Sequence, residues 1–299
     1  MPKNSKPKSK TAGNFQHRCY NLSQMPQKEG TTVFDWDGTI RKVDGAIEGS
    51  FVEPYVAELA KAVKINESEL AEKMRVARQA VIARPQNYGW DIDGIRVASA
   101  TDTYLITQAA ANEILKEMKI EPEQGLLSRI HKHSRSLMDL VFQPGAGEFI
   151  EEIKRSGGAV VVTNSDTADV AKELKELLGS QPGAPVIGNA KKFVVDQTWD
   201  GWRDKMPSSA IQPENYPHPV SLQRPHYFEV LSGLGEIKLV LGDLSELDLL
   251  VPQMMGIKTA LKRTDYTPHW ELSYYGKPSG NRRFLIEDYA NAMDVLKSV

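Results

Sequence analysis

The sequence predicts an α/β fold: a doubly wound parallel sheet that is interrupted, after its first strand, by a block of helices. Two observations support this prediction. Short apolar, β-branched runs alternate with amphipathic stretches through the second half of the chain, a pattern typical of the strand–helix units of a parallel sheet. Residues 45–141, which follow the first such run, show only helical spacing.

The first strand is predicted at residues 31–36, which are β-branched and aromatic and end at the glycine turn of Gly38. Helices in the following block are predicted from apolar positions three and four residues apart, with Pro54 at a helix start. They cover residues 55–64, 67–83, 102–118 and 122–140. The segment between the second and third of these helices is either a specificity loop or an exposed connection.

The second half of the chain contains the remaining predicted strands, and the unbroken β-branched run of 159–163 indicates a strand that is buried on both faces of a sheet. These strands are predicted at 159–163, 185–188, 237–241, 257–261 and 284–286. The helices between them are predicted at 146–156, 166–178, 225–233, 245–255 and 288–297. Residues 196–222 are rich in proline and tryptophan and show no regular pattern.

Composition and charge exclude several classes of protein. The net charge of -2 argues against a general binder of nucleic acids or of membrane surfaces. One cysteine, Cys19, permits no intrachain disulfide, and no segment approaches the roughly 18 apolar residues of a membrane helix. We therefore expect a cytoplasmic protein. Residues 1–30 are predicted to form a tail, and residues 1–13, which are lysine-rich and contain no acid, are predicted to be disordered.

Polar side chains with suitable chemistry follow three of the predicted strands. Asp35 and Asp37 end the first strand, Thr163 and Asn164 end the second, and Asp243 ends a late strand, with Glu246 and Asp248 just beyond it. Ligands of such sheets bind outside the carboxyl ends of the strands, so we expect these residues to share one rim. Two carboxylates two positions apart suit nucleophilic attack on phosphate by Asp35, with Asp37 handling the proton of the leaving group.

A phosphate dianion repels a carboxylate nucleophile, so a divalent cation is needed, and hard oxygen ligands favour Mg²⁺. Asp35 and Asp243 are the predicted carboxylate ligands, with the main-chain carbonyl of Asp37 as a third. Glu246 or Asp248 is expected to orient the water ligands of the metal. The hydroxyl of Thr163, with nearby backbone N–H groups including that of Asn164, is expected to hold phosphate oxygens.

These segments resemble the haloacid dehalogenase (HAD) superfamily, in its phosphatase branch. The first motif of that family, D-x-D-G-T, matches residues 35–39. Its second motif, an apolar strand that ends in Thr or Ser, matches 160–164, and its fourth, an apolar strand followed by G-D and a later acid, matches 239–243 with Asp248. The resemblance implies a Rossmann-like core formed by 31–44 and 142–299. It also implies a helical cap of the C1 type at 45–141.

The third motif of the family is a cation, usually lysine, often placed before proline at a helix start. Arg224, followed by Pro225, fits that context and is favoured here as the phosphate-binding cation. Lys191 and Lys192, which follow the strand predicted at 185–188, remain competitors. Arginine would retain the charge, but as a planar multidentate group where lysine is a compact one.

The resemblance implies a Mg²⁺-dependent phosphoric monoester hydrolase that acts through an aspartyl-phosphate on a small phosphorylated metabolite. The alternative within the same fold is a 2-haloacid dehalogenase. Asp37 argues against it, because halide leaves without a proton. A third reading, a non-catalytic binding protein on this fold, is suggested by the basic tail and by the tryptophans of 196–222. The identity of the substrate and the oligomeric state do not follow from the sequence.

Overall fold

The computed structural model describes residues 30–43, 47–84, 87–92, 95–98, 102–179, 184–277, 279–280 and 282–298. The predicted tail, apart from Gly30, lies outside these residues. The central feature is a six-stranded sheet with the order β11-β10-β9-β1-β4-β5, and every strand pair in it is parallel. The strands are β1 (Thr31–Phe34), β4 (Ala159–Val162), β5 (Val186–Ile187), β9 (Ile237–Gly242), β10 (Thr259–Lys262) and β11 (Arg283–Ile286). The predicted α/β class is confirmed.

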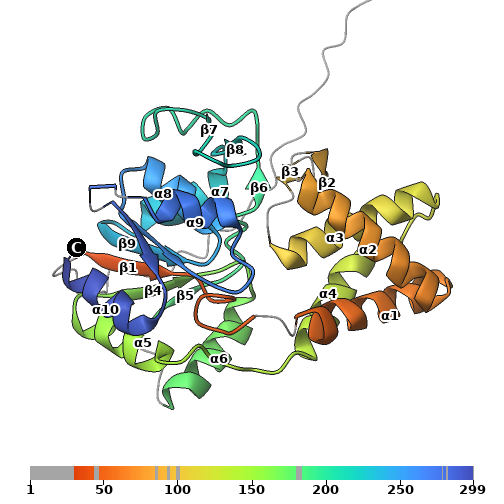
Figure 1. The fold of residues 1–299 in the computed structure, drawn as a ribbon, viewed down its shortest axis with the longest axis horizontal. Coiled ribbons are helices and arrows are strands. Elements are labelled where there is room, and N and C mark those ends of the chain that lie inside the picture. Colours follow the sequence, from red (N-terminus) through yellow and green to blue (C-terminus); the bar gives the residue numbers. More distant parts are fainter. Residues whose placement is uncertain are drawn as a thin grey trace, which may run out of the picture.

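Helices cover both faces of the sheet (Figure 1). Phe34 packs with the apolar residues of α5 (Ala146–Arg155), α6 (Thr167–Leu178) and α10 (Tyr289–Ser298). Val33 packs on the opposite face with those of α7 (Pro225–Gly233), α8 (Leu250–Met254) and α9 (His269–Tyr275). Successive residues of a strand point to opposite faces, so the burial of all four residues of β1 shows that this strand is covered on both sides.

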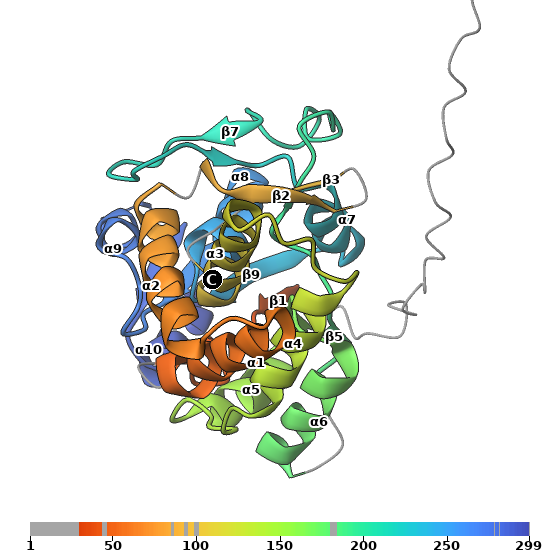
Figure 2. The same cartoon turned by 90° about the vertical axis from the view of Figure 1, so that its right-hand side faces the viewer.

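A group of helices is inserted between β1 and β4 and lies to one side of the sheet (Figures 1 and 2). We call residues 48–136 the helical insertion. It contains a π-helical turn at Glu48–Val52 and the helices α1 (Glu53–Val63), α2 (Glu67–Ala83), α3 (Thr103–Glu117) and α4 (Leu126–Ser136). These elements share an apolar core of their own, which includes Phe51, Tyr55, Leu59 and Ile106.

Two side chains fix helix starts in the helical insertion. Asn66 accepts a hydrogen bond from the backbone N–H of Glu69 at the start of α2. Asp102 accepts one from Leu105 N–H at the start of α3. Such N-caps satisfy donors that have no partner within the helix, which explains why the predicted starts at 67 and 102 are accurate to about one residue.

The prediction that residues 45–141 contain no strand is wrong. β2 (Gly89–Ile92) and β3 (Ile95–Ala98) form an antiparallel hairpin, and β3 also pairs with β6 (Val194–Val195). The Asp-Gly dipeptide at 93–94 in the sequence, between apolar residues, is a hairpin signal that the helical spacing on either side obscured. The ladder with β6 joins the helical insertion to a segment that is almost 100 residues away in the chain.

The segment 196–222 is mostly irregular, as predicted, but it is packed onto the protein. A short antiparallel pair joins β7 (Ala210–Ile211) to β8 (Val220–Ser221). Met206, Tyr216 and Leu222 are buried in the same apolar cluster as α7–α9. The segment therefore forms a layer over that group of helices, and its position relative to the sheet is fixed by side-chain burial.

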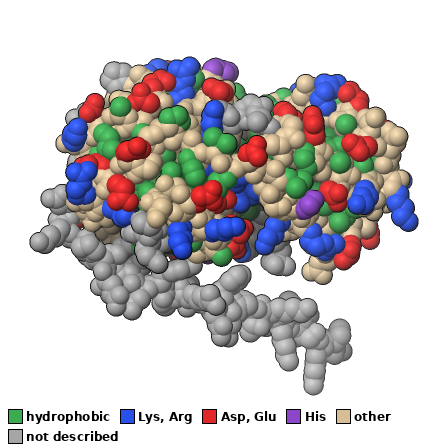
Figure 3. All heavy atoms as spheres, turned by 90° about the horizontal axis from the view of Figure 1, so that it is seen from below, with side chains coloured by type: hydrophobic (Ala, Val, Ile, Leu, Met, Phe, Trp, Pro, Cys, Tyr) green, Lys and Arg blue, Asp and Glu red, His purple; other side chains and the backbone are tan. Residues whose placement is uncertain are grey.

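The surface carries charges of both signs. On the face shown in Figure 3, basic and acidic side chains are interspersed over both lobes, in keeping with the net charge of -2. Among the described residues no helix combines the length and the apolar character that spanning a membrane requires.

Candidate active site

The predicted rim residues lie together at the carboxyl edge of the sheet. β9, β1 and β4 are neighbours, so Asp35, Thr163 and Asp243, which follow them, come from adjacent strands. A cavity of about 450 Å³ opens above them and is lined on its other side by α3 and α4 of the helical insertion. Asp37, Asn164 and Asp248 also line this cavity.

Three of the acids converge. Asp35, Asp243 and Asp248 are buried, and each offers one carboxylate oxygen within 4.8 Å of the other two. Ligands on opposite sides of one Mg²⁺ ion lie about 4.2 Å apart, twice the ~2.1 Å ligand distance. The three carboxylates are therefore close to the spacing of one hard-cation site. Asp248, which was predicted only to orient water ligands, belongs to this group, whereas the carboxylate of Asp37 does not.

Local hydrogen bonds fix two of these acids. Asp243 accepts hydrogen bonds from the Thr39 hydroxyl at 3.1 Å and from the Tyr266 hydroxyl at 2.7 Å. Asp248 lies on a π-helical turn (Ser245–Leu249), and its Oδ2 accepts from the backbone N–H of Leu244 at 3.1 Å. Asp243 is therefore held by side chains of two other segments, and Asp248 by the backbone of its own turn.

A buried ammonium group joins two of the acids. The Nζ of Lys192 lies 2.6 Å from Oδ1 of Asp35 and 2.7 Å from Oδ1 of Asp248. Burial disfavours the charged amine, but the carboxylates of Asp248 and Asp35 raise the pKa of Lys192 above its ordinary value. These two contacts therefore favour the charged form of Lys192 beside Asp35.

The loop that follows β5 directs Lys192 into the site. Lys191 has a left-handed backbone conformation, with φ of 46°, which turns the chain between the strand end and Lys192. Ala190 donates to the carbonyl of Thr163 at 2.9 Å, and the N–H of Lys192 donates to Oδ1 of Asn164 at 2.8 Å. The end of β4 thus holds this loop through two hydrogen bonds.

Arg224 occupies a different position from the one predicted. Its Nη1 donates to the carbonyl of Lys192 at 2.8 Å and its Nε to the carbonyl of Ser221 at 3.1 Å. Its Nη2 lies 3.8 Å from Oε1 of Glu246. Among the described residues it has no hydrogen bond or ion pair with the acids of the cluster, so the cation beside Asp35 is Lys192.

Sequence reasoning could have favoured Lys192 on topological grounds. Lys192 follows β5, a strand of the main sheet, and the loops after such strands share one rim. Arg224 follows β8, which belongs to a separate two-stranded sheet. The proline after Arg224 indicates a helix start, and this prediction is confirmed, because Pro225 begins α7.

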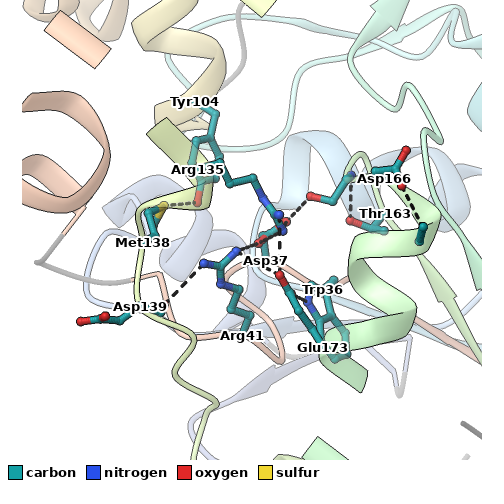
Figure 4. Close-up of polar contacts among 12 residues, drawn as sticks. Trp36, Asp37, Arg41, Tyr104, Arg135, Met138, Asp139, Thr163, Asp166 and Glu173 are labelled. Carbon is teal, nitrogen blue, oxygen red and sulfur yellow. Dashed lines mark hydrogen bonds and ion pairs between the residues drawn. The ribbon is translucent and has the colours of Figure 1, made fainter. Parts of the chain in front are cut away.

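Asp37 faces a charged cluster that reaches into the helical insertion (Figure 4). Arg135 of α4 donates to both carboxylate oxygens of Asp37, at 3.0 and 3.2 Å, and the Ser165 hydroxyl also donates to it. Arg41 lies 3.5 Å away. Glu173 faces both guanidinium groups at 3.6 and 3.7 Å.

The surroundings of Asp37 keep it ionised. Burial acts to raise its pKa, but Arg135, the Ser165 hydroxyl and Arg41 together bring it below the ordinary value. The contact with Arg135 is also a direct link between the rim of the sheet and the helical insertion. Arg135 was not among the predicted site residues, because no local motif marks it.

The pKa values of Asp35 and Asp243 are shifted in the opposite direction. Burial raises the pKa of Asp35 to about 7, assisted by the charge of Asp248 and opposed by Lys192. Burial and the charges of Asp248 and Asp35 raise the pKa of Asp243 well above its ordinary value. Crowded, buried carboxylates of this kind are stabilised by a cation, so the residues present fit a bound Mg²⁺ ion.

Comparison with known proteins identifies the fold. No family model matches the chain, and no curated protein matches it in sequence. Among solved structures, the HAD-hydrolase YfnB from Bacillus subtilis, bound to magnesium, is 15% identical and superimposes with a TM-score of 0.50, over 90% of this chain and 98% of that one.

Two further structures are similar at lower scores. A β-phosphoglucomutase from Thermotoga maritima is 14% identical, with a TM-score of 0.48 over 90% of this chain and 99% of its own. A 2-haloacid dehalogenase from Pseudomonas syringae pv. Tomato is 14% identical, with a TM-score of 0.45 over 90% and 98%. The chain has the fold of the HAD-family hydrolases, as its motifs predicted.

Gly38, in the first motif, lies against Asp243, and its replacement by alanine tests how tightly the two segments pack. Its φ is +83°, and a Cβ at this position would lie 2.2 Å from Oδ2 of Asp243 and 2.2 Å from the Tyr266 hydroxyl. Gly256, with φ of +86° and nothing within 4 Å, is the matched control. We expect Gly256→Ala to lower the free energy of unfolding by about 1 kcal/mol. Gly38→Ala should lower it by roughly 3 kcal/mol, because overpacking adds to the strain. Equal losses in urea titrations would contradict the packing described here.

Glu271 gives a pH-dependent prediction. Burial raises its pKa to about 8; its Oε2 accepts from Ser245 N–H at 3.0 Å. The unfolded chain loses this proton near pH 4.5, whereas the folded protein keeps it to about pH 8. Folding therefore loses stability as pH rises between these values, by up to about 1.4 kcal/mol per pH unit. Glu271→Gln should remove this slope. The variant should therefore become more stable relative to the wild type as the pH rises from 5 to 8, measured by urea unfolding. A constant difference would show that Glu271 is ionised in the folded protein.

Proposed function

We propose that the protein is a Mg²⁺-dependent phosphoric monoester hydrolase in which Asp35 is the nucleophile. The observation that supports this most is the convergence of Asp35, Asp243 and Asp248 on one point of the rim, with the ammonium of Lys192 held 2.6 Å from Asp35. A site with this charge distribution attracts a phosphate dianion only when a divalent cation offsets the acids. The cavity above it gives room for a small phosphorylated metabolite.

In the first step, an oxygen of Asp35 forms a bond to phosphorus while the ester bond breaks and its electron pair passes to the leaving oxygen. The phosphate oxygens are held by the Lys192 ammonium, the Thr163 hydroxyl and the backbone at Asn164. Bound Mg²⁺, held by the cluster that contains Asp243 and Asp248, would offset the charge of the phosphate and of the nucleophile. Glu246 lies behind that cluster. The main-chain carbonyl of Asp37 stays the proposed additional ligand.

Asp37 is the proposed acid and base. It gives a proton to the leaving oxygen in the first step and takes one from water in the second. That water attacks phosphorus, releases phosphate and restores the Asp35 carboxylate. The contacts with Arg135 and Ser165 favour the ionised form, which is the form required as a base. As an acid, Asp37 must carry a proton, so the substrate must displace part of the contact with Arg135 and Ser165 in the first step.

The helical insertion is the proposed cap over the site, with 45–141 as its range and 31–44 and 142–299 as the core. Its residues line the cavity opposite the rim. Among them, His131 lies between Phe51 and Tyr104, with ring centroids at 5.4 and 5.6 Å, and burial lowers its pKa to about 4. The cap therefore presents a neutral histidine beside the cation of Arg135, and we propose that a cytoplasmic metabolite is selected here.

Asp35→Asn is the direct test of this function. The variant keeps the size of the side chain but removes the nucleophile, so turnover of phosphate esters should fall to background while the circular dichroism spectrum stays unchanged. Assays on a panel of metabolite phosphates, with Mg²⁺ and with chelator, would measure this. Turnover in the variant would exclude Asp35 as the nucleophile. Halide release from 2-haloacids without metal would favour a dehalogenase, and an inactive wild type would favour a binding protein.

Lys192→Met tests the proposed phosphate-binding cation, and Lys191→Met is the adjacent control. Removing one preorganised donor from a reacting oxyanion costs about 10²–10³ in rate, so kcat/KM for p-nitrophenyl phosphate should fall by about that factor in Lys192→Met. Lys191→Met should stay within a few-fold of wild type. The reverse order of the two effects would assign the role to Lys191.

A further inference from the structure

We call residues 243–248, which include Asp243, Glu246 and Asp248, the acidic loop. A buried polar cluster lies behind this loop and does not line the cavity. Its members His218, Arg224 and Glu246 are each at most 4% exposed, and none of them is used in the mechanism proposed above. Buried charged groups are costly unless they are paired. The cluster therefore requires a structural explanation of its own.

Arg224 ties three chain segments together with one guanidinium group. It donates to the carbonyls of Lys192 and Ser221 at 2.8 and 3.1 Å and faces the carboxylate of Glu246 at 3.8 Å. Its rigid fork holds these partners in a fixed relative geometry, which a lysine ammonium at this site would not reproduce.

The segment 196–222 supplies the second support for Glu246. Nε2 of His218 lies 3.2 Å from Oε2 of Glu246, so both oxygens of this carboxylate have partners. Tyr216 of the same segment hydrogen-bonds to the Ser245 hydroxyl. The segment 196–222 thus contacts the acidic loop at the consecutive residues Ser245 and Glu246.

These contacts converge on the pair formed by Lys192 and Asp248. The main chain at Lys192 is held on one side by Asn164 and on the other by Arg224. Asp248 is held by Tyr227, whose hydroxyl donates to its carbonyl at 2.7 Å. The 2.7 Å contact between the Lys192 ammonium and Asp248 therefore depends on the relative position of two loops that Arg224 and Glu246 join.

We propose that Arg224 is a positioning residue which, through its pairing with Glu246, holds the Lys192 loop against the acidic loop and so sets the geometry of the phosphate and Mg²⁺ sites. This inference rests on the function proposed for the rim. It assigns Arg224 a role behind the phosphate site, without contact to the phosphate itself. It also explains why the polar side chains of 196–222 are buried at this place.

The test compares Arg224→Gln, Glu246→Gln and the double variant. Partners that orient metal ligands from behind typically change metal affinity or activity by about 10–100-fold. We expect each single variant to weaken Mg²⁺ binding by about that factor, measured by calorimetry. Inhibition by orthovanadate, with p-nitrophenyl phosphate as substrate, should weaken by a similar factor. Because the two side chains act as one unit, the double variant should lose about as much as one single variant and far less than the product.

Leu231→Ala is the control for stability alone. Leu231 lies on α7, the helix that begins after Arg224, and is buried in an apolar cluster. Its truncation should lower the melting temperature while Mg²⁺ and vanadate affinities stay at wild-type values. If the Arg224 and Glu246 variants show the same pattern as Leu231→Ala, or if their losses multiply in the double variant, the positioning role is overturned.

Two provisions keep the test decisive. Arg224→Gln leaves Glu246 with only His218 and could fail to fold for that reason. In that case the double variant, which removes both charges, replaces it. Arg224→Lys, which keeps the cation with fewer contacts, is the second replacement. Arg224→Lys should then bind Mg²⁺ about 10-fold more weakly than wild type, and wild-type affinity would overturn the inference. If the wild type hydrolyses no phosphate ester, the proposed function fails, but Mg²⁺ calorimetry still decides the positioning role.

Discussion

The ammonium of Lys192 between Asp35 and Asp248 is the interaction on which the arrangement of the rim depends. Without it, buried carboxylates from two distant parts of the chain would face one another with no cation of the protein's own between them. A like-charge group of this kind is unstable in a low-dielectric interior. The lysine offsets the charge of the rim acids and, in the function proposed above, the same ammonium would supply the positive charge that binds a phosphate.

Most of the fold could be predicted from local sequence. The strands of the main sheet are largely buried, so β1, β4 and β9 are visible as short runs of apolar and β-branched residues, and the N-caps Asn66 and Asp102 fix helix starts. The hairpin β2–β3 was missed although its Asp-Gly dipeptide is a local signal, whereas the pairing of β3 with β6 could not be predicted, because the two strands lie far apart in the chain. Long-range pairing of two-residue strands leaves no periodic signal.

The candidate site shows the same contrast between residues marked by local sequence and residues placed by tertiary structure. Asp35 and Asp243 were found because they follow strong strands, and the parallel sheet brings such positions together. Lys192 could have been favoured over Arg224, because Lys192 follows a strand predicted for the main sheet, whereas the segment before Arg224 was predicted to be irregular. Arg135 could not be found at all, because it reaches Asp37 from a helix of the insertion, and its position on that helix is that of an ordinary polar residue.

The ladder between β3 and β6 connects the helical insertion to the rest of the protein through the backbone, in addition to the two linkers of the insertion. A shortened chain that joined residue 43 directly to residue 142 would keep every strand of the main sheet. It would nevertheless expose the backbone of β6, which begins two residues after Lys192, as an unpaired edge open to other chains. The insertion is therefore not a removable module, and trimming it would alter the loop that carries the lysine.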